Sequence, residues 1–146
     1  MKILIDGDNC RCLNTIERIA RQKNIPIDIF CDYSHQITSN YANVYMNDVG
    51  ANYTDNIIYN KCTKDDIVIT DDVGLAGLVL LKCNTVLLTN GKILNKHNIK
   101  STLDFRGNMR NIRRKSKRYN LKKIGIKDKH YSFAKSLDIL LQKGVN

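Results

Sequence analysis

MKILIDGDNC, residues 1–10, is an apolar strand that runs directly into two aspartates, Asp6 and Asp8. Side chains of an extended segment alternate between its two faces, so both carboxylates are expected on one face. The sequence IVITDD, residues 67–72, repeats the pattern with a short apolar strand that ends in two acids. Two strands that end in carboxylates predict an acidic, metal-binding pocket.

Further strands and helices alternate along the chain. Apolar periodicity predicts helices at 12–23, 54–62, 73–82, 99–119 and 130–143, with Thr54 as the N-cap of the second, and strands at 1–5, 26–31, 43–46, 67–70 and 84–88. We therefore expect an α/β fold, a three-layer α/β/α sandwich with a mostly parallel sheet of about five strands, followed by C-terminal helices. Ligands of such sheets bind beyond the carboxyl ends of the strands, where the aspartates fall.

Length and charge predict a single domain, residues 1–146, made of two regions. Residues 1–100, the expected α/β core, carry eleven Lys/Arg and eleven Asp/Glu. Residues 101–146, the expected basic helical extension, carry thirteen Lys/Arg against three aspartates and so account for the whole net charge of +10. Because neutralisation of phosphates dominates non-specific affinity for nucleic acids, this charge predicts a polyanionic partner.

The sequence also predicts where the protein works. No apolar run approaches the roughly 20 residues that cross a bilayer, and the chain begins directly with a strand, so we expect a cytoplasmic protein without membrane contact. Five cysteines, an odd number in apolar stretches, are expected to be reduced thiols. His35, His97 and His130 lie far apart, form no ligand spacing and are expected to face solvent or cap turns.

The clustered aspartates have a chemical consequence. Carboxylates brought together repel one another unless a proton, a cation or a metal compensates them. Mg²⁺ and Mn²⁺ take carboxylate oxygens and bind phosphates, lower the pKa of a bound water and neutralise phosphate charge, which favours phosphate-ester chemistry. The alternative is that these aspartates only cap loops and helices, and for Asp55 and Asp72 that explanation alone suffices.

Arginines of the C-terminal region are candidate phosphate ligands. Arg106 and Arg110 are four residues apart, share one face of the expected helix and would clamp a phosphate if that face borders the pocket. Arg113 and Arg114 belong to a longer basic run, from which we expect general attraction of nucleic acid. A solvated helix face is the alternative for all four.

Several motifs of the chain are recognisable together. They are DGDNC at 6–10, TDN at 54–56, DIVITDDVGLA at 66–76, NI at 98–99, Arg106, Arg110 and the segment 133–141. In order and spacing they resemble the YaiI/YqxD-like family of bacterial proteins over nearly the whole chain. That family is similar to PIN-like and NYN-type nuclease domains, so the resemblance implies a PIN-like fold whose acidic pocket binds Mg²⁺ or Mn²⁺ and hydrolyses RNA.

Carried over by position, the resemblance implies four catalytic and metal-binding carboxylates, namely Asp6, Asp8, Asp55 and Asp72. The chain departs from the family pattern at Asn56, where a second acid is usual, and at Asp71, where a small residue is usual. Asn56 lowers the local negative charge, and Asp71 adds a candidate fifth ligand. These changes imply a weakened or shifted metal site.

Three functions are therefore open. The leading one is a metal-dependent nuclease or related phosphodiesterase that acts on RNA. The second is a HAD-like phosphatase, in which Asp6 is the nucleophile and Asp8 the general acid. The third is a non-catalytic RNA-binding protein on an inactive nuclease fold, whose basic C-terminal region makes the contacts.

Overall fold

The computed structural model describes residues 1–48, 53–104 and 133–144. In chain order its elements are β1 (Ile3–Asp6), the 3₁₀ helix η1 (Gly7–Asn9), α1 (Leu13–Lys23), β2 (Ile27–Asp32), β3 (Asn43–Asn47), α2 (Tyr53–Lys61), β4 (Ile67–Ile69), α3 (Val73–Val79), β5 (Thr85–Leu87), β6 (Ile93–Leu94) and α5 (Phe133–Gly144). Residues 99–104 are also helical. Strands and helices alternate as expected, which confirms the α/β class.

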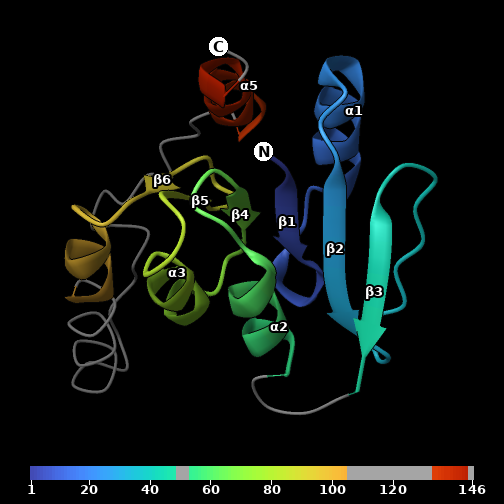
Figure 1. The fold of residues 1–146 in the computed structure, drawn as a ribbon, viewed down its shortest axis with the longest axis horizontal. Coiled ribbons are helices and arrows are strands. Elements are labelled where there is room, and N and C mark those ends of the chain that lie inside the picture. Colours follow the sequence, from blue (N-terminus) through green and yellow to red (C-terminus); the bar gives the residue numbers. More distant parts are fainter. Residues whose placement is uncertain (49–52, 105–132, 145–146) are drawn as a thin grey trace, which may run out of the picture.

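The sheet has six strands in the order β3-β2-β1-β4-β5-β6 (Figure 1). The first five of these strands are mutually parallel, and β6 pairs antiparallel with β5. Strand β6 was not among the strands expected from the sequence; it follows a turn at Gly91, whose φ of 93° suits glycine. The strand order reverses between β1 and β4, so the switch point lies at the carboxyl ends of these two strands.

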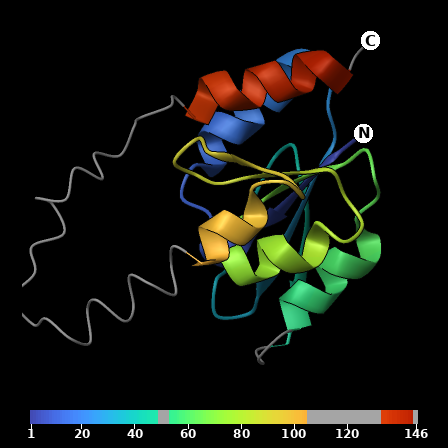
Figure 2. The ribbon, with the colours of Figure 1, turned by 90° about the vertical axis from the view of Figure 1, so that its left-hand side faces the viewer.

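Helices cover both faces of the sheet, as the two views of the ribbon show (Figures 1 and 2). Alternation along β1 separates the two cores: Ile3 and Ile5 pack with α1 and α5, whereas Leu4 packs with α2 and α3. All three side chains are fully buried, which is typical of a central parallel strand. The expected three-layer sandwich is therefore confirmed.

The C-terminal helix α5 is part of this packing. It lies against α1, and its Leu137 and Leu141 side chains are completely buried in the core on that face of the sheet. The Ser136 hydroxyl donates a hydrogen bond of 2.7 Å to the carbonyl of Gly91, and Lys23 forms a 3.1 Å ion pair with Asp138. The last helix thus joins the turn before β6 to the helix after β1.

The start of α2 differs from the expectation. Thr54 is not the N-cap of α2, because the helix already includes Tyr53. The Thr54 hydroxyl instead donates a hydrogen bond to Asp8 Oδ2.

No helix in the described ranges is long and apolar enough to cross a membrane. All five cysteines are free thiols, as expected.

Truncation of Leu137 tests the packing of α5. Leu137→Ala should lower the free energy of unfolding by about 2–5 kcal/mol, because it leaves a cavity between α5, α1 and the sheet. Urea denaturation measures the loss. Ile139→Ala, on the same helix but 40% exposed, is the matched control and should cost much less. Equal effects of the two substitutions would contradict the packing described here.

Candidate metal site at the carboxyl edge of the sheet

The turn after β1 depends on a glycine. The strand ends at Asp6, and η1 turns the chain so that Asp8 no longer follows the alternation of an extended segment. A Cβ atom on Gly7 would lie 2.7 Å from Cδ1 of Ile37 and 3.1 Å from the carbonyl oxygen of Phe30, too close to be accommodated without movement. Glycine at position 7 therefore permits η1 to pack closely against β2 and the loop that follows it.

Asp6 is a buried carboxylate with hydrogen-bond partners. It is 1% exposed, and its Oδ2 accepts hydrogen bonds from Thr70 Oγ1 at 2.8 Å and Asn9 Nδ2 at 3.0 Å. Burial raises the pKa of Asp6, these two hydrogen bonds oppose the rise, and the charges of Asp8 and Asp55 add to it. The hydrogen bonds offset part of the cost of burying the carboxylate.

Asp8 connects three elements. Its Oδ1 accepts a hydrogen bond of 3.2 Å from the backbone N–H of Asp32, and its Oδ2 accepts one of 3.3 Å from the hydroxyl of Thr54. His35 Nδ1 lies 3.1 Å from Asp8 Oδ1. One side chain after β1 thus contacts the end of β2, the loop that follows it and the first turn of α2.

Asp55 and Asp72 approach the site from two helices. Burial raises the pKa of Asp55, and the charges of Asp72 and Asp8 raise it further, so these carboxylates lie near enough to interact. No hydrogen bond to the Asp55 carboxylate occurs within the described ranges. Asp72 caps α3, since its Oδ1 accepts from the N–H groups of Gly74 at 2.9 Å and Leu75 at 3.2 Å. Its capping role and its proximity to the other acids therefore coexist.

Asp71 is engaged elsewhere. Its Oδ1 accepts a 2.9 Å hydrogen bond from the backbone N–H of Thr89, and its Oδ2 accepts one from the hydroxyl of the same residue. These bonds join the segment after β4 to the segment after β5. Both oxygens of Asp71 thus have a structural partner, unlike the carboxylate of Asp55.

Asp32 and His35 also lie at the site, although neither is among the ligands expected from the sequence. In the part of the chain that the structure describes, Asp8, Asp32 and His35 form the one group of three metal-ligating residues whose ligand atoms lie within 4.8 Å of one another. Hydrogen bonds from Ser34 and His35 lower the pKa of Asp32, and the bond to Asp32 raises that of His35. Asp32 ends β2, so the strand-end rule applied to every strand finds it; His35 has no comparable sequence signal.

The chemistry of the donor atoms suits a hard divalent cation, because Asp6, Asp8, Asp55 and Asp72 offer carboxylate oxygens, the ligands that Mg²⁺ and Mn²⁺ prefer. In the part of the chain that the structure describes, no three of these four acids bring their oxygens within 4.8 Å of one another, and Asp8 reaches that spacing with Asp32 and His35 instead. Among the described residues, no lysine or arginine forms an ion pair with these four acids. Burial and the neighbouring carboxylates both raise the pKa values of Asp6 and Asp55, which disfavours their charged forms.

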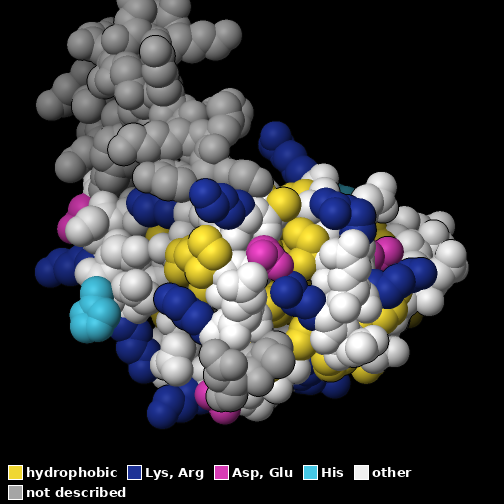
Figure 3. All heavy atoms as spheres, turned by 90° about the horizontal axis from the view of Figure 1, so that it is seen from above, with side chains coloured by type: hydrophobic (Ala, Val, Ile, Leu, Met, Phe, Trp, Pro, Cys, Tyr) yellow, Lys and Arg dark blue, Asp and Glu magenta, His cyan; other side chains and the backbone are white. Residues whose placement is uncertain are grey.

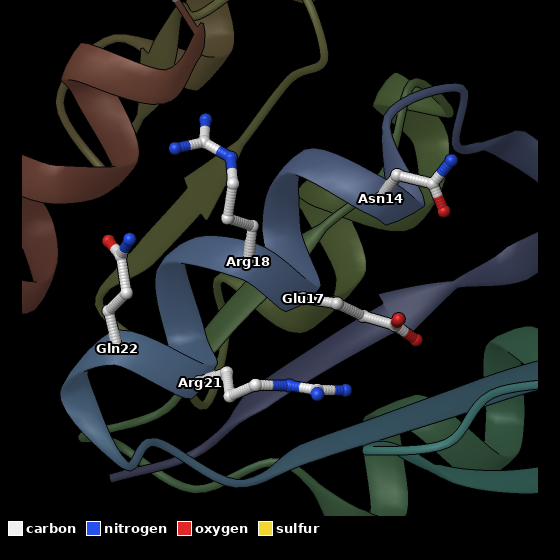
Figure 4. Close-up of a pocket in the computed structure, with 5 residues that line it drawn as sticks. All are labelled: Asn14, Glu17, Arg18, Arg21 and Gln22. Atoms are coloured by element: carbon white, nitrogen blue, oxygen red, sulfur yellow. The ribbon is translucent and has the colours of Figure 1, made fainter.

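The arginines expected to bind phosphate, Arg106, Arg110, Arg113 and Arg114, lie outside the described residues. A hollow of about 390 Å³ on the outer face of α1 does contain two other arginines (Figure 4). There Arg21 lies over the ring of Tyr41 at 5.3 Å, and Arg18 points toward α5. The hollow contains none of the four carboxylates. Lys and Arg side chains are also spread over the end of the molecule where β1 to β3 begin (Figure 3).

Comparisons with known proteins agree on one family. A family model described as "Uncharacterized BCR, YaiI/YqxD family" matches residues 4–143. A UPF0178 protein of Natranaerobius thermophilus is 40% identical over 119 residues, 82% of this chain and 81% of its own. UPF0178 proteins of Clostridium acetobutylicum and Clostridium tetani are 32% and 36% identical, over 84% and 78% of this chain and 82% and 78% of their own. No solved structure matches the chain.

Removing the charge of Asp55 should stabilise the metal-free protein at neutral pH. A raised pKa in the folded state means that stability falls as pH rises from about 4, the value expected for an unfolded Asp, through the folded pKa. Asp55→Asn should therefore raise the free energy of unfolding at pH 7 by less than about 1 kcal/mol, because solvent screens a partly exposed charge.

Urea denaturation in a chelator at pH 7 and below pH 4 measures this difference, which should disappear at the lower pH. Asp65→Asn, at an exposed turn position, is the control and should give no gain. A loss of stability in Asp55→Asn at pH 7 would show that this carboxylate is compensated within the protein.

Proposed function

The chain belongs to the YaiI/YqxD family, and from this membership and its carboxylate site we propose that it is a metal-dependent nuclease that hydrolyses RNA phosphodiesters. The proposal is carried by one observation, the group of interacting carboxylates at the switch point of the sheet with no lysine or arginine paired to them in the described part of the chain. The similarity of that family to PIN-like and NYN-type nuclease domains supports it. The names of these relatives state no activity.

Asp6, Asp8, Asp55 and Asp72 would hold Mg²⁺ or Mn²⁺. When bound, the ion neutralises charge on the phosphate and increases the acidity of water. Asp6 acts from a buried position in which Thr70 and Asn9 fix its orientation. Asp72 is held by the backbone of the first turn of α3.

Substrate binding would use the excess positive charge of the chain. Arg106 and Arg110 are proposed to contact a phosphate near the site, and Arg113 and Arg114 to attract the polyanion more generally. RNA as the substrate and five free thiols together favour the cytoplasm, a reducing compartment. This location is part of the proposal.

The phosphatase alternative is less compatible with the site. It requires Asp6 to attack phosphorus as a nucleophile. With 1% exposure and an oxygen occupied by two hydrogen bonds, Asp6 has little surface from which to reach a substrate. The second alternative, RNA binding without catalysis, is an outcome of the cleavage experiment below.

Divalent metal should stabilise the folded protein. A ligand that binds only the native state adds about 2.7 kcal/mol at 100 times its Kd, and Mn²⁺ should therefore raise the midpoint of urea unfolding. The gain should be smaller in Asp55→Asn, which lacks one proposed ligand, and unchanged in Asp65→Asn. If Mn²⁺ at millimolar concentration leaves the unfolding curve of the natural protein unchanged, the metal assignment fails.

Cleavage of RNA tests the activity itself. The protein with Mn²⁺ should cleave a labelled single-stranded RNA, and Asp55→Asn should reduce the rate by about 100-fold or more, because charge neutralisation by the metal is worth several kcal/mol. Asp65→Asn should cleave at the natural rate. RNA binding without Mn²⁺-dependent cleavage would instead support the non-catalytic alternative.

A further inference from the structure

We propose that Tyr33 and Tyr53 form a stacking platform for the bases of single-stranded RNA beside the carboxylate site. The inference rests on the proposed function for the identity of the nucleic acid. It adds a binding site that is separate from the metal ligands. It also specifies that the protein binds RNA in single-stranded form.

These two tyrosines differ from the other described ones. Both are 55% exposed, and within the described ranges neither phenol forms a hydrogen bond and neither ring contacts another ring or a cation. The others are engaged: the Tyr41 hydroxyl donates to the carbonyl of Ile25 at 2.6 Å, Tyr45 stacks on Phe30 with centroids 5.3 Å apart, and Tyr59 packs under Lys82. Exposed aromatic rings of this kind are enriched where proteins bind partners.

Both tyrosines are adjacent in the chain to residues that contact Asp8. Tyr33 directly follows Asp32, whose N–H donates to Asp8 Oδ1, and Tyr53 directly precedes Thr54, whose hydroxyl donates to Asp8 Oδ2. Adjacent Cα atoms are about 3.8 Å apart, so each tyrosine begins one residue from a group that binds the site carboxylate. The ends of β2 and β3 and the start of α2 lie at one edge of the molecule in Figure 1.

A second set of bonds holds the two tyrosines relative to each other. The N–H of Tyr33 donates to the carbonyl of Asn47 at 3.2 Å, and the Asn47 side-chain amide donates to Thr54 Oγ1 at 3.2 Å. Asn47 at the end of β3 therefore connects the backbone beside one ring to the residue beside the other. A platform fixed by its backbone loses little conformational entropy when a ligand stacks on it.

The chemistry of the platform selects the ligand. An aromatic ring stacks on any base through its π-face, and in a duplex both faces of a base are covered by neighbouring pairs, so stacking on protein requires unpaired bases. The net charge of +10 complements the phosphates of such a strand. Tyr45, 42% exposed with Lys61 Nζ 4.9 Å from its ring, extends the aromatic and basic surface along β3.

Binding without catalysis tests the platform. The full-length protein is titrated in a chelator against a fluorescent single-stranded oligoadenylate and against the same strand with abasic nucleotides at its centre. Tyr33→Ala and Tyr53→Ala should each weaken binding of the oligoadenylate by about tenfold, whereas Tyr33→Phe and Tyr53→Phe, which keep the ring, should change it little. Binding of the abasic strand and of duplex RNA should be the same for all variants.

The result that overturns the proposal is unchanged binding in both alanine variants, or equal losses on the abasic and base-containing strands. Failure of the natural protein to prefer the oligoadenylate over the abasic strand overturns it as well. Unfolding curves of the variants should match that of the natural protein, since both side chains are exposed. The titration contains no divalent metal, so its outcome is independent of the RNA cleavage experiment. A loss of binding that depends on the bases supports the platform even if the protein does not cleave RNA. Conversely, cleavage can occur even if the tyrosines do not bind bases.

Discussion

Hydrogen bonding of β1 between two parallel neighbours is the constraint from which the candidate site follows. β1 pairs with β2 on one side and with β4 on the other, and its apolar residues are buried on both faces of the sheet. A strand held in this way has a fixed register, because a slip of one residue would move every side chain to the opposite face. Asp6 is thereby placed beside Thr70, at the point where the strand order reverses.

The carboxylates of the site lower the stability of the folded protein. Burial raises the pKa values of Asp6 and Asp55, and the charges of neighbouring carboxylates add to the rise, so the charged forms of both groups are disfavoured in the folded protein. Asp6 tolerates burial because Thr70 and Asn9 donate to it, whereas Asp55 has no such donor in the described part of the chain. An uncompensated group of this kind is typical of sites that bind a cation or carry out catalysis.

Asp8 connects the segment after β1 to elements at the edge of the sheet. Its two oxygens contact the end of β2 and the first turn of α2, and Asn47 of β3 joins the same set of bonds through Thr54. His35 contacts Asp8 directly. Tyr33 and Tyr53 are adjacent in the chain to Asp32 and Thr54, which donate hydrogen bonds to Asp8. A single carboxylate thus links the proposed metal site to the proposed base-binding surface, which explains why both lie at one end of the molecule.

The sequence by itself determined the α/β class, most element positions and the candidate acids at strand and helix ends, because these depend on local periodicity and on residues adjacent along the chain. It did not reveal β6, whose two residues show little pattern, or the position of Thr54 within α2. Only the tertiary structure distinguished Asp71, held by Thr89, from Asp72, and brought Asp32 and His35 to Asp8. Those contacts depend on which strands are neighbours and on where each side chain points, and spacing along the sequence carries neither.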